Sequence, residues 1–317
     1  MEAGSTRAAG SRAVPGAPAL GTARRRWGED LIKVLLLLAA LVSVLTTTGI
    51  VVSLLGETIA FFGEINFFDY IFGTKWSPLF EPGSFGVVPL ITGTFLITGI
   101  ALLVAIPLGL GSAIYLSEYA QPRTRRAVKP VLELLAGVPT IVFGYFALTF
   151  FTPEILRGVF DMDVSIFNAL SAGIVMGFMI IPTIASVSED AMSAVPQSLR
   201  EGAFGLGAAK LQVSLRVVFP AALSGIVAAV VLGTSRAIGE TMIVLVAAGQ
   251  VPNLTADPRN PIETMTTFIG ATAKGDLPTG SIEYKTIFAV GTTLFVITLL
   301  MNIISIRFVR KFRQVYE

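Results

Sequence analysis

Residues 201–240 read EGAFGLGAAKLQVSLRVVFPAALSGIVAAVVLGTSRAIGE, and this stretch indicates the fold class. Its first part is polar and rich in glycine, and a long apolar run follows Pro220. The charged side chains deep in that apolar run are Arg236 and Glu240. Charges in a membrane span are costly and usually face a cavity, a partner or a substrate path. The stretch therefore combines a candidate docking segment outside the membrane with a candidate polar site inside it.

The composition is that of an integral membrane protein. Hydrophobic residues make up 53% of the chain and charged residues 14%, whereas a soluble domain carries about 25% charged residues. A span needs roughly 20 mostly apolar residues. The apolar stretches are continuous and not alternating, which favours helices over a barrel. We therefore predict an all-α fold with six transmembrane helices, at about 31–55, 87–116, 131–152, 165–187, 217–248 and 284–307.

Lysine and arginine are distributed unevenly between the predicted loops. If the N-terminus is cytoplasmic, 17 of the 23 basic residues lie on the cytoplasmic side, five lie outside, and Arg236 lies within a span. Cytoplasmic loops of membrane proteins carry an excess of Lys and Arg. We therefore expect both termini to be cytoplasmic and the chain to be a multi-pass membrane protein.

The N-terminal segment differs from the rest of the chain. Residues 1–26 are rich in Ala, Gly, Ser, Pro and Arg, a composition typical of a disordered, basic cytoplasmic tail. Residues 27–317 are then one transmembrane domain. The apolar run at 31–55 is longer than the core of a cleaved signal peptide, so we expect an uncleaved first span. The tail could touch anionic lipid or serve only as a topology anchor.

The residue types exclude several kinds of chemistry. The chain contains no Cys and no His, so disulfides, thiolate nucleophiles and histidine proton relays are impossible. It also lacks a glycine-rich phosphate loop of the G-x-x-x-x-G-K type, so we do not expect it to hydrolyse ATP. We therefore expect no metal site and no cofactor of its own in this chain.

Three regions of the chain suggest local structure. The loop at 56–86 is rich in aromatic residues, which suit a membrane interface, and we expect a short interfacial helix there. Gly137 and Pro139 indicate a kink or an unwound turn in the third run. Glycines in the second run, at 87–116, favour close helix packing.

The segment at 186–216 has more helical pattern than a simple connector needs. Ser188 can cap a helix, and Ser198 followed by Glu201 has the spacing of a capping box. Gly202, Gly205 and Gly207 would leave a shallow surface on which another protein could settle. From the residues alone, a docking loop and an ordinary connector remain open alternatives.

The segment resembles the EAA loop of bacterial ABC-importer permeases. The matching positions carry the spacing Glu-x-Ala, three residues, Gly, nine residues, an aliphatic residue, one residue, an apolar residue and Pro, at Glu201, Gly202, Ala203, Gly207, Val217, Phe219 and Pro220. Gly202 in place of Ala and Phe219 in place of Leu are mild departures. The resemblance implies a type I importer architecture, with Glu201, Gly202, Ala203, Gly207 and Pro220 in the segment that couples to an ATPase subunit.

The resemblance extends over about 27–317 and is strongest to the phosphate-specific branch, in particular its PstC-type subunit. The stretches that carry it are LELLAGVPTIVFGYF, SEDAMSAVPQSLREGAFGLGA and SRAIGETMIV. It implies that this chain forms the path for inorganic phosphate with a second permease subunit. It further implies an ATPase dimer, which binds ATP and magnesium, and an extracytoplasmic phosphate-binding protein. It also implies that the chain is a transport subunit and not an enzyme, placed in the bacterial cytoplasmic (inner) membrane, with membrane lipid around the assembly and no nucleic acid partner.

Arg236 and Glu240 are the candidate substrate-binding residues. At 1.5 Å per residue both fall near the middle of the membrane, and the i, i+4 spacing places them on one helix face. They could form a neutralised pair that locks helices together. Alternatively, Arg236 offers planar donors to a tetrahedral oxyanion. Glu240 would then hold Arg236 in place or accept a hydrogen bond from a protonated phosphate oxygen, which sulfate does not offer.

The sequence thus predicts a membrane-spanning permease subunit of an ATP-driven phosphate importer that works by alternating access. Three alternatives remain open at this point. One is the same machine for another oxyanion, such as sulfate or molybdate. The others are a secondary carrier that works without an ATPase and a membrane sensor or scaffold that transports nothing.

Overall fold

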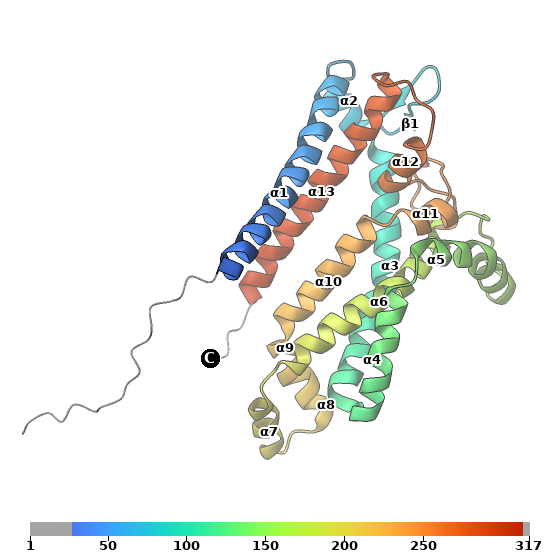
Figure 1. Ribbon diagram of the computed structural model, residues 1–317. Coiled ribbons are helices and arrows are strands. Elements are labelled where there is room, and N and C mark those ends of the chain that lie inside the picture. Colours follow the sequence, from blue (N-terminus) through green and yellow to red (C-terminus); the bar gives the residue numbers. More distant parts are fainter. Residues whose placement is uncertain (1–26, 313–317) are drawn as a thin grey trace, which may run out of the picture. The chain divides into compact units, whose positions relative to one another are not determined.

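The computed structural model describes the backbone over residues 27–312 and side chains over 29–307, so the tail predicted at 1–26 lies outside the described residues. The described chain is mainly helical (Figure 1). It divides into two compact units, one up to Ser53 and one from Leu54 onward. The first unit contains the larger part of helix α1 (Trp27–Phe62), a continuous apolar helix.

The described residues include enough long apolar helices to cross a membrane four to six times. Four helices satisfy length and composition by themselves, and two further helix pairs do so together, although each pair is bent. Every predicted span overlaps one of these six segments. The single helices are Glu29–Phe62, Val88–Tyr119, Ala169–Ser193 and Ile282–Arg307, and the pairs are Pro122–Ala136 with Thr140–Val159 and Lys210–Ala221 with Leu223–Ile238.

The first bent pair confirms the break predicted at Gly137 and Pro139. Helix α4 (Pro122–Ala136) ends there, and α5 (Thr140–Phe146) begins after the break and continues into the π-helical segment η2 (Ala147–Val159). The angle between α4 and the segment Thr140–Val159 is 87°. A proline cannot donate a backbone hydrogen bond, so the helix ends before it and restarts after it. Helix α4 also occupies most of the basic stretch at 117–130, between the second and third predicted spans.

The second bent pair replaces part of the continuous helix predicted at 217–248. Helix α8 (Lys210–Val213), the π-helical segment η3 (Ser214–Val218) and α9 (Phe219–Ala221) meet α10 (Leu223–Ile238) at 73°. The bend follows Pro220, whose missing N–H interrupts the helical hydrogen bonds. Helix α10 ends at Ile238, and a separate short helix, α11 (Met242–Ala247), follows.

The core of the second unit is formed where α3 (Val88–Ile114) packs on α6 (Ala169–Ser193). A Cβ atom at Gly177 would lie 2.8 Å from Cβ of Val104, and one at Gly173 would lie 2.7 Å from Cβ of Ile100. Both distances are too short for a real contact, so only glycine permits this approach. Glycine packing therefore brings α3 and α6 together, as small residues do between membrane helices.

A second core lies at the opposite end of this unit from α7 and α8, and we call this region the α12 end (Figure 1). It contains the predicted short helix as α2 (Phe67–Phe72), together with an antiparallel ribbon of β1 (Trp76–Ser77) and β2 (Ser84–Phe85). Helices α12 (Met265–Thr272) and α13 (Ile282–Phe312) pack against them.

The aromatic residues near α2 differ in their environment. Phe61, Tyr70 and Trp76 are buried in the core of the α12 end, with edge-to-face ring contacts from Tyr70 to the other two. Phe68 and Phe72 are exposed. An interfacial position is thus wrong for the buried rings, because tertiary packing encloses them.

Candidate coupling and substrate sites

In the segment at 186–216, which resembles a docking loop, the helix caps predicted from the sequence do not form. Helix α6 continues through Ser188 to Ser193, so Ser188 does not start a helix. Helix α7 (Gln197–Gly205) begins after Pro196, and no side chain caps it, so the capping box of Ser198 and Glu201 does not form. The fixed φ of proline suits the entry to a helix and replaces the side-chain cap.

The outer surface of α7 and of the turn after it is open. Glu201 and Gly202 are exposed, and added Cβ atoms at Gly202 and Gly207 would meet no atom within 4 Å. Leu206 is 91% exposed, the highest value among the large hydrophobic side chains in the described residues. Leu206 could not be singled out from the sequence, because it occupies a variable position of the docking pattern. An exposed apolar tip beside small residues suits a protein–protein contact.

Gly207 also has a backbone role. Its φ angle is +82°, in the left-handed region that side-chain-bearing residues rarely adopt. Its N–H donates to the carbonyl of Phe204 at 2.9 Å, which closes the turn after α7. The glycine in the docking pattern is therefore needed for the turn, whatever binds there.

Ala203 and Pro220 do not share the open surface of Glu201 and Gly202. Ala203 is half-buried and packs on the core formed by the ends of α3, α6 and α10. Pro220 lies in α9, at the 73° bend that leads into α10. The five predicted coupling residues therefore have different surroundings. Three lie on the open surface, Ala203 packs on a core, and Pro220 lies at a helix bend.

Arg200 anchors α7 to the rest of the unit. It is only 9% exposed, and its Nη2 lies 3.0 Å from Oε1 of Glu118, in the π-helical segment η1 (Tyr115–Tyr119) that ends the second span. Its Nη1 donates to the carbonyl of Val195 at 2.5 Å, and its Nη2 donates to that of Met192 at 2.8 Å. One guanidinium therefore joins α7 to the ends of two spans.

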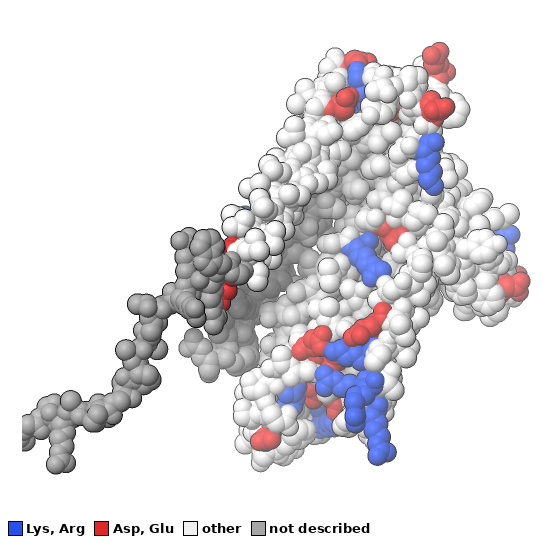
Figure 2. All heavy atoms as spheres, viewed as in Figure 1, with Lys and Arg blue, Asp and Glu red and all other residues white. Residues whose placement is uncertain are grey.

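A second ionic cluster joins α4 to the end of α6. The buried Glu189 carboxylate pairs with Arg125 and, at 2.9 Å, with Lys129. Lys129 also contacts Asp190 at 2.5 Å. Charged side chains of both signs gather at this end of the unit (Figure 2). Since buried charges are stable only when paired, the cluster fixes α4 against α6 close to α7.

Arg236 lies in the last turn of α10 and is half-buried. Its Nη1 donates to Oγ1 of Thr183 in α6 at 3.1 Å. Among the described residues, no carboxylate forms an ion pair with it. Its guanidinium thus keeps further donors available, and its charge is not neutralised by any described carboxylate.

Glu240 lies beyond the end of α10, so the predicted i, i+4 pair on one helix face does not exist. Its Oε1 accepts from the backbone N–H groups of Met242 at 2.9 Å and Ile243 at 3.2 Å, at the start of α11. Its own carbonyl accepts from Oγ1 of Thr266 in α12 at 2.8 Å. Neither the predicted helix-locking pair nor the predicted orientation of Arg236 by Glu240 is seen, because Gly239 ends the helix between them.

Residues 105–314 match the model of the family described as "Binding-protein-dependent transport system inner membrane component". The match covers more than half of the chain, so the chain belongs to this family of transport-system membrane components.

Relatives extend the match toward the N-terminus. The chain is 33% identical to the phosphate transport system permease protein PstC of Haemophilus influenzae, over 91% of this chain and 95% of the relative. It is 36% identical to the probable ABC transporter permease protein YqgH of Bacillus subtilis, over 78% of this chain and 79% of the relative. It is 38% identical to PstC 1 of Mycobacterium tuberculosis, over 72% and 73%. These relatives are ABC transporter permease subunits.

Solved structures show the same fold at low identity. A chain of a bacterial ABC transporter that imports alginate superposes with a TM-score of 0.64 at 16% identity, over 91% of this chain and 100% of that one. A chain of the MetNI methionine ABC transporter gives 0.53 at 20%, over 72% and 95%. The fold is therefore that of an ABC importer permease.

Proposed function

We propose that this chain is a permease subunit of an ATP-driven importer of inorganic phosphate. The names of the PstC relatives, which match most of the chain, support the substrate. In this proposal it pairs with a second permease subunit in the bacterial inner membrane. A separate ATPase dimer binds ATP and magnesium, and an extracytoplasmic binding protein delivers phosphate. This subunit moves its substrate without changing it chemically.

The observation that carries the proposal is the guanidinium of Arg236, which has one hydrogen bond to Thr183 and no carboxylate partner in the described chain. An unneutralised charge in a span is costly. A phosphate oxyanion passing Arg236 offers acceptors in the geometry that a guanidinium binds well. Arg236 then holds the anion at mid-path.

Glu240 contributes selectivity in this proposal. Its Oε1 is held by the amides of Met242 and Ile243, which leaves Oε2 to accept a proton-bearing oxygen of the substrate. Phosphate near neutral pH carries such a proton, whereas sulfate does not. The carboxylate would therefore repel sulfate and accept monohydrogen or dihydrogen phosphate.

Coupling starts at the exposed surface of α7. Closure of the ATPase dimer on ATP would move α7, and Arg200 would carry the motion to the ends of α3 and α6 through its contacts with Glu118 and the carbonyl of Met192. Because α10 packs on α6, the same motion reaches Arg236. The substrate site would then alternate between the two sides of the membrane.

Radiolabelled phosphate uptake tests the proposal in proteoliposomes that hold the four-component assembly, with and without ATP and with excess sulfate. We expect uptake that requires ATP and that sulfate does not reduce. Uptake without ATP would indicate a secondary carrier. An assembled complex that takes up sulfate or molybdate but no phosphate would reassign the substrate.

A further inference from the structure

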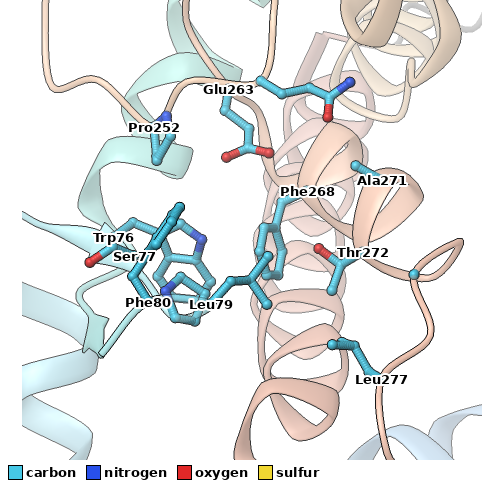
Figure 3. A pocket seen from close by; sticks show the side chains of 13 residues that line it. Trp76, Ser77, Leu79, Phe80, Pro252, Glu263, Phe268, Ala271, Thr272 and Leu277 are labelled. Carbon is cyan, nitrogen blue, oxygen red and sulfur yellow. The ribbon is translucent and has the colours of Figure 1, made fainter. Parts of the chain in front are cut away.

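A pocket of about 350 Å³ opens at the α12 end, between the ribbon of β1 and β2 and helix α12 (Figure 3). Its walls are mainly apolar and aromatic, with Trp76 and Phe268 inside and the exposed side chains of Leu79 and Phe80 at its edge. Glu263 is the only charged residue among those that line it. The transport path proposed above does not use this pocket.

Trp76 offers the pocket an unused hydrogen-bond donor. The residue is 2% exposed, and its ring packs edge to face on Phe268 with a centroid distance of 4.9 Å. The indole Nε1 is buried and has no hydrogen-bond partner in the described part of the chain. Leaving a buried donor unsatisfied costs about 1–3 kcal/mol, so an acceptor entering the pocket gains that interaction.

Glu263 offers a carboxyl group in the same space. It is 6% exposed, and no described side chain or backbone group bonds or pairs with its carboxyl. Burial alone raises the pKa of Glu263 to about 7. Figure 3 shows the Glu263 carboxyl and the Trp76 indole extending into the same space, the carboxyl from above in this view.

The position of Glu263 is fixed by its backbone. An added Cβ at Gly93 in α3 would overlap the carbonyl oxygen of Glu263, so the loop that carries Glu263 touches α3 at this point. Thr264 then caps α12 through its side chain, which accepts from the N–H of Thr267 at 3.2 Å. The carboxyl therefore projects from a well-held backbone, and a shift of the loop does not easily bring it to solvent.

The lining of the pocket determines which chemical group a ligand there should carry. An anion would be repelled by the Glu263 carboxylate, and a hydrocarbon would leave the indole N–H and the carboxyl unsatisfied. An ammonium or guanidinium group neutralises the carboxylate, and its methylene stem suits apolar walls. Aromatic rings also attract cations within about 6 Å. A carbonyl beside the stem would accept from the indole.

We infer that this pocket seats one lysine or arginine side chain of the extracytoplasmic binding protein, with its cationic head on the Glu263 carboxylate and a partner carbonyl on Trp76 Nε1. The inference rests on the proposed function, because it needs that partner and that orientation. The family is one of binding-protein-dependent systems. The elements β1 and α12, which contribute residues to the pocket, lie at the end of the unit away from α7 (Figure 1).

The first test measures how tightly the purified binding protein of the same organism binds the full transporter in lipid nanodiscs. Glu263→Gln keeps the shape of the side chain and removes its charge, so we expect binding at least tenfold weaker. Trp76→Phe should weaken it less. Asp276→Asn removes one exposed negative charge next to the pocket-lining residue Leu277, and as the matched control it should change binding less than twofold.

Two further measurements identify the guest. Binding of the wild type should strengthen between pH 6 and pH 8, because a cation binds the deprotonated carboxyl, and Glu263→Gln should lose this dependence. If the guest is lysine, a carbodiimide should join Glu263 to its amine as an amide, the carbodiimide taking up the water. n-Butylammonium and n-butylguanidinium should compete with the binding protein better than 1-butanol.

Wild-type affinity in Glu263→Gln would overturn the inference, as would equal competition by 1-butanol. Binding of n-butylammonium without loss of binding-protein affinity would also overturn it and point to a site for small free amines. Phosphate uptake in the same preparation separates the two proposals. Normal uptake with Glu263-independent docking would refute only the pocket, whereas Glu263-dependent docking without phosphate uptake would refute only the substrate.

Discussion

At the residue scale, the charged side chains of this protein differ in whether an opposite charge lies beside them. Arg236 has a hydrogen bond to Thr183 but no carboxylate partner in the described chain, and Glu240 holds the start of α11 instead. Glu189 and Arg200, by contrast, are buried with their charges paired. An unpaired cation in a span is the arrangement expected of a binding group, and a paired one is the arrangement expected of a structural group.

Arg236→Gln should reduce phosphate uptake at least a hundredfold while assembly and membrane level stay normal, because the amide cannot replace the guanidinium charge. Arg236→Lys should retain partial uptake with a raised KM, since ammonium binds as a point charge without the planar fork. Uptake kinetics in proteoliposomes measure both effects. Ser235→Ala, next to it, is the control, and uptake in Arg236→Gln equal to that of this control would end the assignment.

The titration of the buried Glu263 carboxyl should make the folding stability of the protein depend on pH. Its pKa is raised from 4.5 to about 7 by burial, so the folded state binds this proton more tightly than the unfolded state does. Stability from this group is therefore present below pH 4.5 and is lost as the pH rises through 7, by about 3 kcal/mol at most.

Glu263→Gln should remove the loss of folding stability that accompanies the rise in pH, because the amide does not titrate. The measured quantity is the melting temperature of the wild-type transporter minus that of Glu263→Gln, both without the binding protein. We expect this difference to be smaller at pH 8 than at pH 5.5. Thermal scanning of the purified complex gives both values. A constant difference between the two proteins across this range would show that Glu263 does not titrate there.

At the scale of elements, α7 is a short helix held by one buried arginine and presenting one exposed tip. Its position depends on Arg200, which contacts η1 and the end of α6. Its outer surface depends on Leu206 and the glycines around it. Anchoring and docking can therefore be tested separately.

Arg200→Gln should uncouple the transporter, because it leaves the Glu118 carboxylate buried without its partner and loosens α7 from two spans. We expect phosphate uptake at least tenfold lower, with ATP hydrolysis retained. The ratio of phosphate transported to ATP hydrolysed is the measurement. Arg126→Gln removes an exposed charge from α4 and should leave the ratio unchanged, and an unchanged ratio in Arg200→Gln as well would refute the anchoring role.

Leu206→Glu should weaken ATPase binding about tenfold, which corresponds to about 1.4 kcal/mol, because a charge replaces the apolar tip. Co-purification and titration of the ATPase measure it. Leu254→Glu, an exposed leucine in the loop before α12, is the matched control. Leu206 is a cleaner probe than Gly207, whose substitution strains the backbone at φ +82° even without a partner. ATPase affinity equal to that of Leu254→Glu would place the docking surface elsewhere.

At the scale of the whole molecule, the second unit is built on the close contact of α3 and α6. Helix α7, the Arg236 site and the α12 end all attach to these two helices, through Arg200, Thr183 and Gly93 respectively. A change in their separation should therefore affect all three regions at once.

Gly177→Val should destabilise the fold by about 1–3 kcal/mol, the usual cost of overpacking, because its Cβ would meet Val104 and the carbonyl of Ala101. Gly99→Ala lies in α3 with nothing within 4 Å of an added Cβ and should not lower stability. Apparent melting temperatures of the two purified variants compare the effects. Equal melting temperatures of the two variants would show that α3 and α6 can move apart to accommodate the larger side chain without loss of stability.

Much of this protein follows from the sequence alone. Continuous apolar runs can satisfy their backbone in lipid only as helices, so six spans could be predicted from composition and length. The break at Gly137 and Pro139 could also be predicted, because glycine and proline have strong local effects. The docking role of 186–216 and the substrate role of Arg236 and Glu240 stay predictions. The spacing of Glu201, Gly207 and Pro220 was sufficient to suggest the family.

Tertiary structure decided what these residues contact. A linear pattern put Arg236 and Glu240 on one helix face, but Gly239 ends the helix and the free N–H groups of α11 take the carboxylate. Arg200, Leu206 and the pocket of Trp76 and Glu263 were not singled out, because burial and exposure depend on segments far apart in the chain. Local sequence specifies where a helix forms and breaks, whereas packing between distant segments decides which charges are paired and which remain available for a ligand.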